Sequence, residues 1–326
     1  MEKNTLEINH LCTSFFSSKG EIRAVNDVSL VVPKRSIIGI VGESGCGKSM
    51  TARSIMRLIK YPGKIVGGEV SLVGKKLTAL SEHDMANVRG EEISMIFQEP
   101  MTSLNPVMKV GRQVQEAVLL HHKISPKEAK AEVLAMFEKV GIADPERRYS
   151  LYPHELSGGL RQRVMIAMAM ICRPKLLIAD EPTTALDVTV EAQILNLMKT
   201  LRDEIGTSII LISHNLGVVA QICDFVYVMY AGRIVEQAET FELFDHPVHP
   251  YTVELLRAVE SLERKSERLD TIPGAVPLLS NLPQGCSFAP RCAHACADCA
   301  PDCPELTDLG NGHLVRCIHA KEEVRA

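Results

Sequence analysis

Residues 42–49 read GESGCGKS and fit the pattern G-x-x-x-x-G-K-[ST]. An apolar run at 36–42 precedes this segment and helical spacing begins at Lys48, as expected of a loop between a buried strand and a helix. The glycines allow a tight turn whose backbone N–H groups point inward, and the start of the helix adds a positive dipole end. The segment therefore predicts a cradle for the phosphates of a nucleoside triphosphate.

A second segment, LLIADEP at 176–182, is an apolar strand that ends in two carboxylates. Together with the phosphate cradle it predicts a magnesium-dependent hydrolase. Lys48 would reach the β- and γ-phosphates, and the Ser49 hydroxyl would bind Mg²⁺. Asp180 would be the outer magnesium partner, and Glu181 would polarise the attacking water.

Composition narrows the class of protein. The chain has 326 residues, 46% apolar residues and a net charge of -4, which offers no basic field for nucleic acid. It contains no run of about 20 apolar residues and no apolar N-terminal leader, so we expect a cytosolic chain that reaches a membrane only through a partner.

The order of the expected elements indicates an α/β fold. Antiparallel strands are expected at 6–15 and 24–33, and helices over 107–150, about 159–172, 190–205 and 219–224. A hairpin is expected at 225–237. Alternating strands and helices around a phosphate loop favour a mainly parallel sheet. We place one domain at 1–262 and a second, cysteine-bearing region at 263–326, because periodic segments give way there to Pro, His and Cys.

Five motifs occur in an order that resembles an ABC-type ATPase domain. They are the phosphate loop, Gln98 after a buried strand, LSGG at 156–159, ADEPTTALD at 179–187, and His214 after SIILIS. The resemblance implies a mainly parallel core, an antiparallel β subdomain and a helical subdomain at about 100–172. It also implies two such domains that face each other head to tail, with each ATP between one phosphate loop and the other domain's LSGG.

The resemblance also assigns roles. Gln98 would contact magnesium or the attacking water, Asp187 would organise the dimer seam, and His214 would hold the γ-phosphate and Glu181. Ser157 would clasp the partner-bound γ-phosphate, although alone it is better explained as a helix N-cap. The nucleotide-binding residues implied are Phe15, Ser44, Gly45, Cys46, Gly47, Lys48, Ser49, Met50, Gln98, Ser157, Gly158, Gly159, Asp180, Asp187 and His214.

Two positions depart from a simple match or stay open. Leu160 stands where the family commonly has Gln, and the peptide-importer branch often has an apolar residue there. The aromatic residue that stacks on adenine is assigned to Phe15, with Phe16 as the competitor, and either side chain could instead belong to the core.

The type of ABC protein is inferred by excluding other types and from the likeness of the C-terminal segments. The interval between the phosphate loop and LSGG is too short for the coiled coil of a repair ATPase, and the chain has one ATPase half rather than two. The segments at 245–259, 272–277 and 282–292 look like the C-terminal extension of oligopeptide, dipeptide and nickel importer ATPases.

This likeness implies a motor subunit at the cytoplasmic face of the inner membrane. Its partners would be two multi-span permease subunits, a second ABC ATPase and an extracytoplasmic solute-binding protein. We expect the permease contact at 99–114, a segment that could equally be subdomain core. Three alternatives remain: an importer of nickel or another small solute, an ABC ATPase acting on a cytosolic partner, and a redox sensor whose cluster gates the ATPase.

Six of the ten cysteines lie between Cys286 and Cys317, which favours a metal or cluster over disulfides in the cytosol. The resemblance implies a [4Fe–4S] cluster on Cys286, Cys292, Cys299 and Cys317. Cys296 and Cys303 exceed the four ligands needed. Because 296 and 299 form C-x₂-C, a zinc site is one alternative, and thiols that bind no metal are the other.

Overall fold

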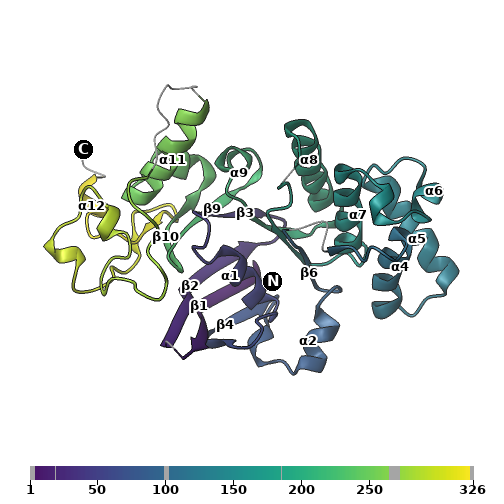
Figure 1. The fold of residues 1–326 in the computed structure, drawn as a ribbon, viewed down its shortest axis with the longest axis horizontal. Helices are drawn as coiled ribbons and strands as arrows, with labels where there is room; N and C mark the ends of the chain where they lie inside the picture. The colour runs from purple at the N-terminus through teal and green to yellow at the C-terminus, as the bar shows by residue number, and fades with distance from the viewer. Residues whose placement is uncertain (1–3, 19, 99–102, 185, 264–271, 324–326) are drawn as a thin grey trace. The chain divides into compact units, whose positions relative to one another are not determined.

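The computed structural model describes residues 4–18, 20–98, 103–184, 186–263 and 272–323. These residues form two compact units, which Figure 1 shows in ribbon form. The first unit consists mainly of Ala79–Ile210. The second consists of Leu6–Val31, Ile37–Thr78 and the chain from Leu211 onward. In the described residues, no helix is long and apolar enough to cross a bilayer.

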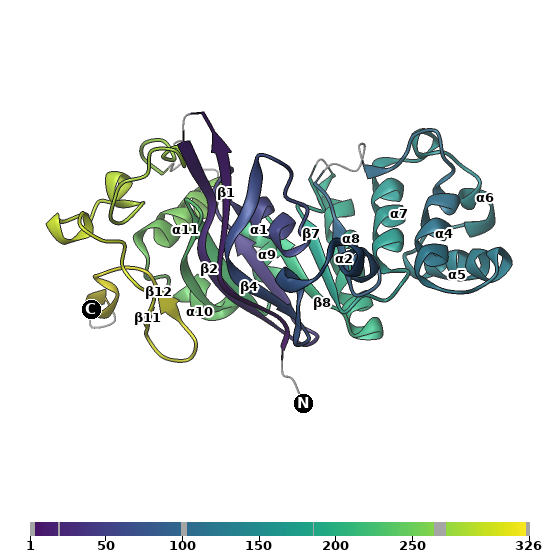
Figure 2. The same cartoon turned by 90° about the horizontal axis from the view of Figure 1, so that it is seen from below.

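The second unit contains an antiparallel sheet near its N-terminus. Its strands follow the order β2-β1-β4-β5, and the views in Figures 1 and 2 agree in placing β1, β2 and β4 side by side. The bounds are β1 (Asn4–Ser17), β2 (Gly20–Pro33), β4 (Gly63–Leu72) and β5 (Lys75–Lys76). The alternation of apolar and polar residues at 6–15 and 24–33 correctly predicted the first two strands.

A second group of strands in this unit carries the phosphate loop. Strand β3 (Ile37–Val41) is buried at every residue and pairs in parallel with β9 (Phe225–Tyr230), which pairs antiparallel with β10 (Arg233–Glu239). The predicted buried strand and the predicted hairpin are therefore confirmed. The helices of this unit are α1 (Lys48–Ile55), α9 (Leu216–Ile222), α10 (Thr240–Asp245), α11 (Pro250–Glu263) and α12 (Ala320–Glu323).

Helix α9 begins three residues before the predicted start at 219. The side chain of Asn215 accepts a hydrogen bond from the backbone N–H of Val218 and so caps the helix at Leu216. The predicted start overlooked this cap.

The first unit combines parallel strands with a helical layer. Strands β6 (Ile93–Ile96) and β7 (Leu176–Asp180) pair in parallel, and helices α4 and α5 contact each other and both contact α6 and α7. The helices are α2 (Glu82–Val88), α4 (Val110–His121), α5 (Pro126–Lys139), α6 (Pro145–Tyr149), α7 (Gly158–Met170) and α8 (Val188–Ile205). Strand β8 (Ser208–Ile212) follows α8. The predicted helices at 107–150 are confirmed, whereas α2 was missed because it buries only Met85 and Val88.

The cysteine-bearing extension packs within the second unit. Strand β12 (Leu314–Val315) pairs with β10, β11 (Thr307–Asp308) pairs with β12, and Val248, Val315 and Ala320 form a small apolar cluster. Two-residue strands have no period that a sequence pattern can reveal, so these pairings were not predicted. The predicted domain boundary at 262 and 263 stays a prediction, and residues 264–271 lie outside the described residues.

A buried carboxylate joins the extension to β10. Glu236 is fully buried and accepts hydrogen bonds from the backbone N–H groups of Val248 at 2.8 Å and His249 at 3.0 Å. It also contacts Nε2 of His313 at 2.8 Å. Burial alone would lower the pKa of His313, but the hydrogen bond and the charge of Glu236 outweigh burial and raise it.

This ion pair predicts a pH-dependent stability difference between the native chain and a His313→Gln variant. Because the pKa of His313 is raised in the folded state, its contribution is complete below the unfolded value of about 6.5 and is lost as pH rises through the folded value. Thermal unfolding from about pH 6 to about pH 9 should show the difference in Tm shrinking with pH. The exposed His83→Gln is the control, and a difference constant over this range would contradict the assignment.

Candidate nucleotide-binding site

The loop between β3 and α1 has the backbone that its glycines predicted. Gly42, Gly45 and Gly47 have φ values of 144°, 80° and 111°, a region that favours glycine. A Cβ atom at Gly42 would collide with the carbonyl oxygen of Met229, and one at Gly47 with that of Ala24. Both positions therefore require glycine because a neighbouring backbone lies against the loop.

Lys48, the first residue of α1, lies inside this loop. Its side chain is buried, and Nζ donates hydrogen bonds to the carbonyl oxygens of Gly42 at 2.7 Å and Glu43 at 3.0 Å. The ammonium and the N-terminus of α1 thus place positive charge at one end of the loop, which suits an anion.

Other predicted residues of this unit differ in how accessible they are. Cys46 is fully buried, and burial raises the pKa of its thiol, so this residue can offer a ligand only its backbone. Phe15 is half-buried and pairs in register with Gly63, while the more exposed Phe16 lies under the ammonium of Lys64 at 4.9 Å. His214 follows β8 and is exposed. The roles predicted for these residues, and for Ser44, Ser49 and Met50, stay predictions.

In the first unit, the parallel pairing of β6 and β7 brings two predicted residues together. Gln98 follows β6 and Glu181 follows β7, so both lie at the carboxyl edge of the pair. Nε2 of Gln98 donates to Oε2 of Glu181 at 2.8 Å, and the hydroxyl of Thr184 donates to the same oxygen at 3.1 Å. Glu181 has a φ of 48°, an unusual backbone for a residue with a side chain. Asp180 is buried beside it at the end of β7.

Sequence reasoning missed Thr184. A threonine three residues after a strand-end carboxylate is a signal only in hindsight, because such a spacing is common at turns. Here its hydroxyl fixes the orientation of the Glu181 carboxylate.

The LSGG segment and Asp187 lie at the starts of neighbouring helices. The Ser157 hydroxyl accepts from Leu160 N at 3.4 Å and caps α7, and the Asp187 carboxylate accepts from Val190 N at 2.9 Å and caps α8. A Cβ at Gly159 would lie 3.0 Å from a methyl of Val190, so this glycine allows the two helix starts to approach closely. Ser157 and Gly158 are exposed and can meet an external anion.

Four of the extension's cysteines line one cavity. They are Cys286, Cys292, Cys299 and Cys317, with His249, Phe288 and His319 also in its wall. Burial, with a further contribution from the neighbouring thiols of Cys286, Cys292 and Cys299, raises the pKa of the Cys317 thiol to about 11. At the rim, Sγ of Cys296 lies 3.8 Å from Sγ of Cys299 and 3.6 Å from Nε2 of His319.

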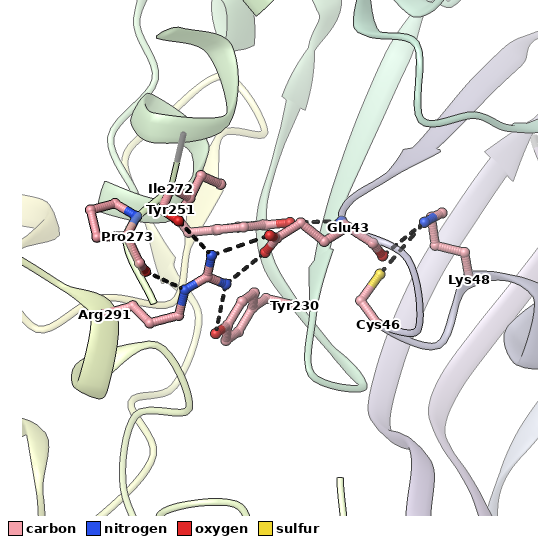
Figure 3. A network of polar contacts seen from close by, with 8 residues as sticks. All are labelled: Glu43, Cys46, Lys48, Tyr230, Tyr251, Ile272, Pro273 and Arg291. Carbon is pink, nitrogen blue, oxygen red and sulfur yellow. Dashed lines mark hydrogen bonds and ion pairs between the residues drawn. The ribbon is translucent and has the colours of Figure 1, made fainter. Parts of the chain in front are cut away.

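A network of polar contacts links the extension to the phosphate loop (Figure 3). The guanidinium of Arg291 binds the carboxylate of Glu43 through two N–O contacts, at 2.7 and 3.2 Å. The backbone N–H of Glu43 donates to the hydroxyl of Tyr251 at 2.9 Å. Neither Arg291 nor Tyr251 was predicted to touch the loop, because both lie over 200 positions away in the sequence.

Comparisons with known proteins agree with this geometry. Residues 25–184 match the family model described as ABC transporter, and residues 235–299 match the model described as oligopeptide/dipeptide transporter, C-terminal region. A probable peptide ABC transporter ATP-binding protein of Sinorhizobium fredii is 52% identical, covering 98% of this chain and 96% of the relative. The oligopeptide transport ATP-binding protein AppD of Bacillus subtilis is 49% identical, covering 98% and 97%.

Solved structures show the same fold. The dimeric structure of MJ0796, a bacterial ABC transporter cassette, is 25% identical, with a TM-score of 0.65 over 72% of this chain and 98% of that chain. The structure of cbiO1 from Clostridium perfringens is 26% identical, with a TM-score of 0.66 over 80% and 100%. The predicted fold class is thereby confirmed. The chain belongs to the ABC transporter ATP-binding proteins, in the branch that carries the oligopeptide/dipeptide transporter C-terminal region.

Proposed function

We propose that this chain is the ATP-hydrolysing motor subunit of an importer of dipeptides or oligopeptides. The observation that carries the proposal is the presence, in one chain, of a phosphate loop and a C-terminal region matched by the peptide-transporter model. Relatives that match nearly the whole chain are named for peptide or oligopeptide transport, which supports this substrate class.

The phosphate loop and Lys48 would hold the triphosphate. Ser49, Asp180 and Gln98 offer hydroxyl, carboxylate and amide oxygens, the hard donors that Mg²⁺ prefers. Mg²⁺ would neutralise charge on the phosphates. Glu181 would accept the proton of the attacking water, and the hydrogen bonds from Gln98 and Thr184 support this role because they fix its carboxylate.

A head-to-tail dimer would supply the second half of each site. The exposed Ser157 and Gly158 at the start of α7 form an anion-binding helix end, and Asp187 caps the helix beside it. In this arrangement His214 would contact the γ-phosphate. The dimeric structure of a related cassette supports such an assembly. We further propose that the partner domain is a second ATPase chain.

Two permease subunits and an extracytoplasmic binding protein would complete the importer, with this chain peripheral at the cytoplasmic face of the inner membrane. An open groove of about 710 Å³ in the first unit, lined by Val107, Tyr152 and His154 among others, supports a docking surface. Val107 is 83% exposed and belongs to the predicted contact segment 99–114. Residues 99–102 of that segment lie outside the described residues.

We propose that the extension holds a [4Fe–4S] cluster on Cys286, Cys292, Cys299 and Cys317. These thiols line one cavity, which supports a shared metal group.

A specific observation also favours zinc. In a tetrahedral site the Zn–S distance is about 2.3 Å and the Zn–N distance about 2.0 Å. Two sulfur ligands of one zinc ion then lie about 3.8 Å apart, and a sulfur and a nitrogen ligand lie about 3.5 Å apart. The contacts of Cys296 with Cys299 and His319, 3.8 and 3.6 Å, match these values.

The metal content of the purified protein separates these two groups. Because Cys299 belongs to both ligand sets, only one group can be present at a time. If the cluster is present, anaerobically purified protein should contain iron and sulfide, which Cys286→Ser loses and Cys296→Ser keeps. If zinc is present instead, the protein should contain zinc, which Cys296→Ser loses and Cys286→Ser keeps. Elemental analysis with the visible absorption spectrum makes the measurement, and protein without iron and without zinc would contradict both assignments.

Replacing Glu181 with Gln should lower ATP turnover by about 10²- to 10⁴-fold and leave ATP affinity near the native value, because the amide cannot accept the proton from water. Steady-state phosphate release and nucleotide titration make the measurements. Glu146→Gln, at an exposed ion pair with Lys130, is the matched control. Turnover at the native rate in the Glu181 variant would remove this residue from the catalytic role.

Replacing Val107 with Asp should reduce co-purification with the permease subunits from detergent-treated native membranes, because the charge would be desolvated in the groove. ATP hydrolysis by the isolated chain should not change. Leu120→Asp, at an exposed apolar residue outside the groove lining, is the control. Equal permease recovery with both variants would place the docking surface elsewhere.

A further inference from the structure

Every N–H group of the Arg291 side chain has a hydrogen-bond acceptor. Besides Glu43, its guanidinium donates to the carbonyl oxygens of Pro273 at 2.8 Å and Ile272 at 3.3 Å, and to the Tyr230 hydroxyl at 3.4 Å. With the two bonds to Glu43, all five N–H donors of the side chain are used. The side chain is only 4% exposed, so this is a desolvated, bidentate ion pair rather than a surface contact.

The other side of this ion pair rests on packed aromatic rings. Tyr230, Tyr251 and Phe288 are buried, with ring centroids 4.6 to 5.4 Å apart. They come from β9, from α11 and from the extension, and the centre of the Arg291 guanidinium lies 5.9 Å from the rings of Tyr230 and Phe288. Such packing leaves Arg291 one orientation, so it can fix the group that it binds.

Three groups of Glu43 are held by three different residues. Its carboxylate binds Arg291, its N–H donates to Tyr251, and its carbonyl oxygen accepts from Lys48 (Figure 3). The position of Glu43, together with that of Gly42, therefore sets where the ammonium of Lys48 lies. Since Glu43 is the second residue of the phosphate loop, a shift of its backbone also reorients the N–H groups that follow it.

We propose that Arg291 is a positioning residue for ATP binding, acting through Glu43 to hold the phosphate loop in its binding conformation. The cysteine-bearing extension thereby forms part of the nucleotide site of its own chain. Arg291 directly precedes Cys292, so the segment that grips the loop also carries a residue of the thiol-lined cavity. This inference rests on the proposed binding of ATP by the phosphate loop.

A double-mutant cycle on the full-length chain tests the proposal, with the dissociation constant of a fluorescent ATP analogue and Mg²⁺ as the readout. Arg291→Ala and Glu43→Gln should each weaken binding by about tenfold, since each removes the charge-assisted pair. The double variant should be no weaker than the worse single one. KM for ATP should rise in each variant, while kcat at saturating ATP stays within about twofold.

Several controls keep the result interpretable. Arg257→Ala breaks an exposed ion pair with Glu254 on α11 and should leave the affinity unchanged. Where Arg291→Ala lowers Tm so far that the chain is unfolded at the assay temperature, Arg291→Lys replaces it in the cycle. Lysine keeps the charge but cannot form the two parallel bonds, so it should still weaken binding.

The outcomes separate this inference from the proposed function. Native affinity in folded Arg291→Ala, or losses that multiply in the double variant, would overturn the positioning role while ATP binding stands. A lowered Tm with unchanged ATP affinity would show that Arg291 serves only the folding of the extension, and would also overturn the proposal. Native protein that fails to bind the nucleotide would remove the basis of both.

Discussion

The backbone of the phosphate loop is the constraint on which the second unit depends. To present N–H groups to an anion, the loop must turn through left-handed conformations at Gly42, Gly45 and Gly47. Two of these glycines lie directly against the backbone of other strands, at Met229 and Ala24. The β9–β10 hairpin and β2 therefore support the loop from outside, and the loop conformation is a property of the unit rather than of the segment.

The first unit holds the carboxylate of Glu181, the residue for which we propose the role of general base. The parallel strands β6 and β7 end at the same edge, so Gln98 and Thr184 can both donate to Glu181. For Ser157 and Asp187 the structure shows one role, helix capping, and we propose a second at the dimer seam. Each caps a helix of its own chain, and each lies at an exposed helix start that suits the proposed dimer seam.

The extension is tied to its unit by buried charges rather than by a large apolar core. Glu236 binds two backbone N–H groups and His313, and Glu43 binds Arg291. Removing one partner of such a pair by mutation would leave the other charge buried without its partner, which costs several kcal/mol. Arg291, which contacts the phosphate loop, directly precedes Cys292, which lines the thiol cavity. A metal group at the thiols and the nucleotide site would therefore share one structural element.

The sequence alone determined the fold class, the phosphate loop, the buried strand before it and the strand-end carboxylates. Local sequence is enough to predict these features. Glycines and a lysine at fixed spacing restrict the loop conformation and the ligand that it can bind, and apolar runs indicate buried strands. The sequence did not reveal α2, the short strands of the extension, the contacts of Thr184 and Tyr251, or the partner of Arg291. Only the tertiary structure decided these, because an ion pair between residues 43 and 291 or a two-residue strand depends on which segments fold side by side, and no local pattern records that.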